Sequence, residues 1–377
     1  MKFIKLLLIN ISVLFALFSS LIFAIVIFSE VTRIYNDNYG YKSTNCIRSS
    51  CQEVYNNYPW AKKHFLEYSR LKFHYESPVV WRADQFNGET INILPNYQRK
   101  TINKHQESKF KAYFFGGSVV WGFGSNDENT IPSQFSSISS ITSSNYGESA
   151  WTSDQSLLYL MKLIKAGHRP DYVIFINGVN DIAKCYSDKP NFYGFLQEDN
   201  LKIKLKESIR SYSRISFENY FSIPIEFLNR FFRKKIPEEQ KNKENMTGCK
   251  KYNGYSLIAK NMVENWKIAN SIVKNFNGKF IAILEPNIYY TNTKIHPSIK
   301  IINYDRDETK KIYSLVSELV SKLSYVYDYK DIYNGIEEYV FTDIGSHVSP
   351  DANRFMANKI FSIIKEKNNE LDEKIIK

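Results

Sequence analysis

The chain has 377 residues, 43% hydrophobic and 24% charged, so it is long enough for a large buried core and its composition excludes wholesale disorder. The formal net charge of +11 is concentrated in residues 201–251, which hold 13 Lys and Arg against 6 Asp and Glu. Because this surplus lies in one segment and no nucleic-acid-binding motif is present, the sequence argues against nucleic acid as a partner. It favours a solvated basic insertion over a site for polyanions or anionic lipid.

The N-terminus contains an uninterrupted apolar stretch. Leu6–Phe28 is 23 residues without a charge, and as a helix it is about 34 Å long, enough to cross a bilayer. Lys2 and Lys5 precede it, which predicts a cytosolic N-terminus and an extracytoplasmic main body, periplasmic or at the cell surface. We therefore expect residues 1–30 to form a signal anchor or transmembrane helix. The competing interpretation is a cleaved signal peptide, although no small-x-small cleavage site ends the stretch.

The four cysteines fit an exported protein. Three pairings are possible, of which Cys46–Cys51 and Cys185–Cys249 are the simplest, and four free thiols are the alternative. If Cys185 and Cys249 pair, Leu201–Cys249 becomes a tethered flap. The sequence contains neither Cys-x-x-Cys nor His-x-x-x-His, so we predict no metal site and no cofactor.

Residues 31–109 are predicted to form a membrane-proximal region. Tyr58–Tyr68 has the pattern of a short amphipathic helix, and Pro78–Arg82 and Thr90–Leu94 have extended patterns. Arg99–Lys109 is polar and is interpreted as a linker or surface loop.

Residues 110–377 alternate between strand and helix patterns, with the basic insertion at 185–251. The predicted strands are Lys111–Phe115, Ser144–Tyr146, Tyr172–Ile176, Lys279–Leu284 and Tyr325–Tyr329. The predicted helices are Asp154–Lys165, capped by Ser153 or Asp154, then Tyr255–Phe276, Glu308–Leu323 and Asp351–Lys365. This alternation predicts an α/β domain with a mostly parallel sheet.

Ligands bind such sheets beyond the carboxyl ends of the strands, and polar residues and glycines gather there in this sequence. Six of the fifteen glycines follow strand ends: Gly116, Gly117, Gly122, Gly124, Gly147 and Gly178. Ser118 follows the first strand, Asn180 follows the third, and Asp343 and His347 precede the last helix. Each is an ordinary turn or cap residue when taken alone.

Together these residues supply the parts that acyl transfer requires. A serine becomes a nucleophile when an imidazole removes its proton, and a carboxylate orients that imidazole. Main-chain N–H groups and a side-chain amide stabilise the oxyanion that forms.

The chain resembles the SGNH hydrolases, the GDSL-type esterase and lipase superfamily. Its four blocks read Gly116-Gly-Ser118, Gly147, Gly178-Val-Asn-Asp181 and Asp343-Ile-Gly-Ser-His347, and the resemblance spans roughly Lys111–Ile364. It implies a flavodoxin-like three-layer sandwich around a mostly parallel five-stranded sheet. It also implies Ser118 as nucleophile, His347 as base, Asp343 as its orienting group, and Gly147 and Asn180 as oxyanion donors.

Two departures from the family pattern are present. Gly117 stands where the family usually has aspartate. Three residues separate Asp343 from His347 where the family has two, so the extra residue either bulges harmlessly or turns Asp343 away. A looser resemblance covers Pro78–Asn92, which is similar to the region preceding the catalytic domain in exported SGNH proteins linked to surface polysaccharides.

The sequence therefore predicts a membrane-anchored, extracytoplasmic serine esterase that acts on short acyl esters, O-acetyl groups above all, of a cell-surface polysaccharide. One alternative is a polysaccharide O-acetyltransferase with the same Ser–His site, supplied by a membrane acyl-donor protein. The other is an inactive SGNH-fold module that binds glycans or assists their assembly.

Overall fold

The computed structural model describes residues 2–39, 49–104, 108–186, 190–196, 198, 248–301 and 303–367. The chain divides into two units, one containing residues 1–45 and 197–245 and the other containing the rest. Most of the basic insertion, including the predicted flap, lies outside the described residues.

Helix α1 (Lys2–Tyr39) is the main described part of the first unit, which also contains Glu198. Its Phe3–Ile25 portion is long and apolar enough to cross a membrane. A signal sequence meets the same criteria of length and composition. Most of its described apolar side chains are exposed. The helix continues past residue 30, where the predicted anchor ends.

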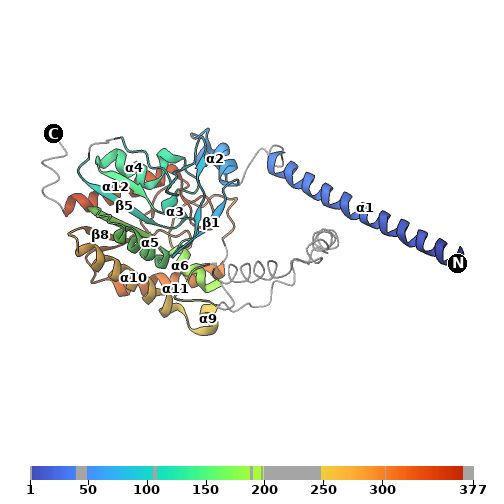
Figure 1. The fold of residues 1–377 in the computed structure, drawn as a ribbon. Helices are drawn as coiled ribbons and strands as arrows, with labels where there is room; N and C mark the ends of the chain where they lie inside the picture. The colour runs from blue at the N-terminus through green and yellow to red at the C-terminus, as the bar shows by residue number, and fades with distance from the viewer. Residues whose placement is uncertain are drawn as a thin grey trace. The chain divides into compact units, whose positions relative to one another are not determined.

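A five-stranded parallel sheet forms the centre of the second unit, as predicted (Figure 1). Its strands lie in the order β6-β5-β7-β8-β9, and all neighbouring pairs are parallel. The strands are β5 (Lys111–Gly116), β6 (Thr142–Asn145), β7 (Tyr172–Asn177), β8 (Lys279–Leu284) and β9 (Val326–Asp328). The order along the sheet reverses at β5, so the carboxyl ends of β5 and β7 form the crevice in which such sheets bind ligands.

Helices cover both faces of the sheet, which makes three layers (Figure 1). Helices α4 (Ile131–Ser139) and α12 (Pro350–Glu366) pack together on one face, where Phe114, Ile174 and Ile281 point into the core. Helices α5 (Ser153–Lys165), α10 (Tyr255–Lys274) and α11 (Asn303–Val320) form the opposite layer. Burial on both faces explains why the central strands β5, β7 and β8 are continuous apolar runs, whereas the edge strand β6 is polar.

The boundaries of several elements differ from the predictions. Thr152 caps α5 through a reciprocal capping box with Gln155, where Ser153 or Asp154 was expected. Strand β6 begins two residues earlier than predicted, and β9 is shorter by one residue at each end.

Residues 49–104 pack against the α/β layers. They contain α2 (Ala61–Tyr68) and the hairpins β1–β2 (Phe73–Glu76, Val80–Ala83) and β3–β4 (Phe86–Asn87, Asn92–Ile93). The interpretation of Arg99 as the start of a polar linker was wrong. Its guanidinium is fully buried, because Asp127 and two main-chain carbonyls neutralise and bind it.

A disulfide joins Cys185 to Cys249, as predicted. Cys51 is also disulfide-bonded, whereas Cys46, its predicted partner, lies outside the described residues. The Cys185–Cys249 bond joins the end of helix α6 (Val179–Ala183) and the short 3₁₀ turn after it to helix α9 (Gly248–Tyr252).

We expect the Cys185→Ser/Cys249→Ser variant to be less stable than the parent chain. The bond closes a loop of 64 residues, and in the chain-entropy model such a loop stabilises the folded state by about 4 kcal/mol. Urea unfolding followed by tryptophan fluorescence in detergent should show a lower midpoint for the variant than for the oxidised parent. Reduction of the parent, which also breaks the disulfide at Cys51, should lower the midpoint at least as far. Equal midpoints for the oxidised parent and the variant would contradict this prediction.

Candidate active site

The turn after β5 requires two glycines for steric reasons. A Cβ on Gly116 would lie 2.3 Å from the carbonyl oxygen of Ile176 on β7. A Cβ on Gly117 would lie 2.2 Å from Nδ2 of Asn180. The strand can therefore turn sharply into helix α3 (Ser118–Trp121), with Ser118 as its first residue and half-exposed. The glycine at 117 leaves the space that the Asn180 amide occupies.

The hydroxyl, imidazole and carboxylate predicted from the sequence form a chain of hydrogen bonds. Nε2 of His347 lies 2.6 Å from Oγ of Ser118, and Nδ1 of His347 lies 2.7 Å from Oδ2 of Asp343. In the tautomer that fits both contacts, Nδ1–H donates to the carboxylate and Nε2 accepts from the serine hydroxyl. This arrangement lets the imidazole take the serine proton as the oxygen attacks a carbonyl.

The additional residue between Asp343 and His347 is accommodated by a tight turn. Ser346 adopts φ = +62°, and the main-chain N–H groups of Gly345 and His347 donate to Oδ1 of Asp343 at 2.9 and 3.4 Å. A β-bridge between Phe341 and Val348 closes the loop. The turn therefore directs the carboxylate at the imidazole.

The electrostatic surroundings keep Asp343 ionised. Burial alone would raise the pKa of this carboxyl, but the His347 charge and the hydrogen bonds from His347 and Gly345 outweigh it and lower the pKa below its usual value. Asp343 therefore stays an anion over the whole pH range in which the imidazole can act as a base.

Phe123 is a part of the site that the sequence analysis missed. Its ring centroid lies 4.0 Å from that of His347, with an angle of 30° between the planes. It lies between Gly122 and Gly124, which take φ values of +98° and +75°. Clustered glycines next to an aromatic residue were the available signal, but only the fold shows that the ring packs on the imidazole.

The predicted oxyanion donors differ in their availability. Nδ2 of Asn180 donates to the carbonyl oxygen of Trp151 at 2.9 Å, which leaves its second N–H for a ligand. The Gly147 N–H donates to Oδ1 of Asn145 at 3.0 Å, so in this conformation it is engaged within the chain.

Ala150 differs from Gly147 in its main-chain hydrogen bonding. The amides of the residues around it are engaged within the chain, namely those of Glu148, Ser149 and Trp151. No acceptor is found for the Ala150 N–H among the residues that the structure describes. Ala150 takes φ = +62° and is only half-buried. It lies beside Trp151, whose carbonyl oxygen is 3.3 Å from the Cβ position of Gly117.

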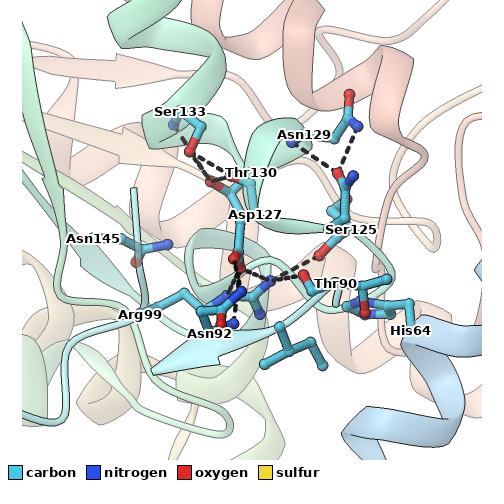
Figure 2. A network of polar contacts seen from close by, with 12 residues as sticks. His64, Thr90, Asn92, Arg99, Ser125, Asp127, Asn129, Thr130, Ser133 and Asn145 are labelled. Carbon is cyan, nitrogen blue, oxygen red and sulfur yellow. Dashed lines mark hydrogen bonds and ion pairs between the residues drawn. The ribbon is translucent and has the colours of Figure 1, made fainter. Parts of the chain in front are cut away.

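A buried ion pair supports the loop that follows Ser118 and α3 (Figure 2). Nε of Arg99 lies 2.9 Å from Oδ1 of Asp127, and Nη2 donates to the carbonyl oxygens of Ser125 and Thr90. The guanidinium also lies 4.3 Å from the ring centroid of Trp121, the last residue of α3. Residues 90–99 thereby contact both ends of the loop that follows Ser118.

A second buried pair supports the loop after β6. Nε of Arg82 lies 3.4 Å from Oε2 of Glu148, and the Ala83 N–H donates to the same oxygen at 2.9 Å. The indole N–H of Trp81 donates to the carbonyl oxygen of Ser149. The segment Pro78–Asn92 thus holds the loop that presents Ala150. Within the described ranges, no group of three or more His, Cys, Asp and Glu is arranged to hold a metal ion.

The sheet order and the positions of the four motif blocks agree with one architecture. Ser118 follows β5, Asn145–Gly147 follow β6, Asn180 follows β7, and His347 precedes the last helix. The chain has the three-layer α/β fold with a five-stranded parallel sheet that its resemblance to the SGNH hydrolases implied. The strand order and the motifs at the strand ends agree with that resemblance.

Sequence comparison is sparse. No family model matches the chain. An ATP-dependent RNA helicase of Acanthamoeba polyphaga mimivirus is 25% identical over 156 residues, which make up 40% of this chain and 27% of the helicase. The chain thus spans about a quarter of the length of that relative.

Several solved structures are similar to this SGNH fold at low identity. A lipolytic protein of the G-D-S-L family from Desulfitobacterium hafniense is 13% identical and has a TM-score of 0.38. The aligned region covers 68% of this chain and 99% of the Desulfitobacterium chain. An arylesterase from Agrobacterium tumefaciens is 11% identical with the same coverage and a TM-score of 0.40. A carbohydrate acetylesterase from Sinorhizobium meliloti is 13% identical, again covers 68% and 99%, and has a TM-score of 0.38.

The contact between Gly117 and Asn180 leads to a prediction for Gly117→Ala. The new methyl group would displace the Asn180 amide, so kcat for p-nitrophenyl acetate should fall about 10²-fold, as it does when one oxyanion donor is lost. Asn180→Ala should lose a similar factor. The double variant should lose no more than either single variant, because both changes remove the same donor. Multiplicative losses in the double variant would contradict the prediction.

Proposed function

We propose that the protein is a serine ester hydrolase of the SGNH type that forms an acyl-enzyme on Ser118. The hydrogen-bonded line from Ser118 through His347 to Asp343 is the observation that carries the proposal. An inactive module would have no need of a carboxylate held by two main-chain N–H groups and directed at the imidazole. The unusual spacing therefore gives no support to the non-catalytic alternative.

The reaction proceeds in two halves. Ser118 Oγ attacks the ester carbonyl while His347 Nε2 takes its proton, and the oxyanion is stabilised by Asn180 with the Ser118 and Ala150 N–H groups. The imidazolium then protonates the leaving alcohol, and the C–O bond of the ester breaks. Water, deprotonated by His347, attacks the acyl-serine and releases the acid and free Ser118.

We place the substrate outside the cytoplasm, as a short acyl ester on a cell-surface polysaccharide. The disulfide between Cys185 and Cys249 supports an oxidising compartment, and the Phe3–Ile25 helix supports export or anchoring. The likeness of Pro78–Asn92 to regions of polysaccharide-linked SGNH proteins supports the substrate class. If a sugar hydroxyl replaces water, the same residues carry out O-acetyl transfer.

Labelling with a fluorophosphonate tests the nucleophile directly. The full chain in detergent should form one adduct, located by mass spectrometry on the peptide that contains Ser118, because the probe phosphonylates an activated serine. Ser118→Ala and His347→Ala should abolish labelling. Both variants should keep the urea midpoint of the parent chain. A parent chain that is folded but not labelled would contradict the proposal of a catalytic serine.

Surface-glycan acetylation in the producing cell separates hydrolase from transferase. If water is the acceptor, Ser118→Ala should raise the O-acetyl content of the glycan, because acetyl groups are no longer removed. If a sugar is the acceptor, the same substitution should lower that content. Ester content is measured by proton NMR of purified glycan, with cells expressing the parent chain as the control. An unchanged content would contradict a polysaccharide substrate.

A further inference from the structure

A buried carboxyl group lies at the same edge of the sheet as the nucleophile. Glu285 directly follows β8 and is 3% exposed, and its N–H donates to the carbonyl oxygen of Asn177 on β7. Its Oε1 accepts a hydrogen bond from the Val179 N–H at 2.6 Å. Val179 is the first residue of helix α6, and the next residue is Asn180.

The packing leaves this turn little room to move. A Cβ on Gly178 would lie 3.2 Å from Cγ of Glu285 and 2.5 Å from the hydroxyl oxygen of Tyr313. The hydroxyl of Tyr313 in turn donates to the main-chain oxygen of Glu285 at 2.9 Å. The Glu285 side chain accepts the hydrogen bond from Val179, the residue before Asn180. The orientation of the Asn180 amide therefore depends on this turn.

No cation pairs with Glu285 in the part of the chain that the structure describes. The titratable groups that face it are Asp181 on α6, Tyr313 on α11 and Tyr333 after β9, and none of them carries positive charge. The nearby buried amine of Lys184 is paired with Asp154 and Asp181. Burial raises the pKa of Glu285 to about 8; the Val179 N–H opposes this shift, and Asp181 adds to it.

We propose that Glu285 is a positioning residue of the hydrolytic site, which holds Val179 and Asn180 while it is neutral and impairs the site when it ionises. This inference rests on the proposed function. An uncompensated carboxylate in this position carries the same sign as the oxyanion that Asn180 stabilises, and charges interact strongly in a buried environment. Hydration of the new charge would also loosen the turn that holds the amide.

The sign of the pH effect is fixed by the two groups. The base His347 acts in its deprotonated form, so catalysis otherwise rises with pH. Glu285 acts in its protonated form, so catalysis falls as the pH rises through its folded pKa. Together they predict a bell-shaped profile whose falling limb belongs to Glu285.

The test uses the full chain in detergent with p-nitrophenyl acetate from about pH 6 to about pH 9.5. For the parent chain, kcat should fall about tenfold on the alkaline side. Glu285→Gln keeps an oxygen acceptor for Val179 but cannot ionise, so it should keep the kcat of the parent at pH 7 and lose the falling limb. Glu285→Ala should lose about tenfold in kcat at every pH with KM little changed.

The matched control is Glu308→Gln. Glu308 is also a buried carboxyl that accepts a hydrogen bond from the hydroxyl of Tyr255 at 2.7 Å, and among the described residues no hydrogen bond or ion pair joins it to α6. This variant should retain the falling limb. A falling limb that persists in Glu285→Gln would overturn the inference.

Thermal unfolding tests the neutral state of Glu285 without relying on activity. A buried carboxyl with a raised folded pKa stabilises the fold fully below its unfolded pKa and loses that contribution as the pH rises to the folded value. The melting temperature of Glu285→Gln relative to the parent should therefore be several degrees higher at about pH 8.5 than at about pH 5.5. A difference that does not change with pH would overturn the inference.

The two experiments separate the possible failures. If Ser118→Ala hydrolyses the ester as fast as the parent chain, the proposed function fails, and the melting data still decide the state of Glu285. If hydrolysis depends on Ser118 but Glu285→Gln keeps the parent profile, only the role of Glu285 fails.

Discussion

The hydrogen bond between Ser118 and His347 is the contact on which the site depends. It joins residues 229 positions apart in the chain, and it forms only because β5 ends at the switch point of the sheet while the loop before α12 returns to the same edge. A shift of one ångström in either segment would break a 2.6 Å contact. Most of the neighbouring structure can be understood as support for these two segments.

That support comes from two sides. On the sheet side, Gly116 and Gly117 allow β5 to approach β7 and the Asn180 amide. On the N-terminal side, Arg99 and Arg82 are buried with Asp127 and Glu148, and each pair holds one loop of the site. Removing one partner from a buried pair leaves an uncompensated charge, which is far more costly than never having buried the pair. Residues 49–104 are therefore a structural part of the candidate site.

The pKa values of the Asp343 and Glu285 carboxyl groups are shifted in opposite directions because their surroundings differ. Asp343 is bonded to an imidazole and two main-chain N–H groups, which lower its pKa despite burial. Among the described residues, Glu285 has one N–H partner, Val179, and an acidic neighbour, Asp181, so burial dominates and raises its pKa. The contrast follows the rule that specific hydrogen bonds and opposite charges favour the ionised form, whereas desolvation disfavours it. The first group suits a permanent anion, and the second suits a neutral hydrogen-bond acceptor.

The sequence by itself predicted the parallel sheet, its five strands and the motif blocks that carry Ser118, Asp343 and His347, because apolar runs and strand-end motifs are local patterns. It offered the Cys185–Cys249 bond as one of several possible pairings, and the fold selected it. Only the tertiary structure showed that a turn with Ser346 at positive φ accommodates the additional residue before His347. It also showed that the Gly147 N–H donates to Asn145, whereas the Ala150 N–H has no acceptor among the described residues. The fold also buries Arg99, which was predicted to begin a linker, and it bonds the Glu285 side chain to the turn that contains Val179 and Asn180. These properties depend on which distant groups surround a residue, and no pattern within a short stretch of sequence contains that information.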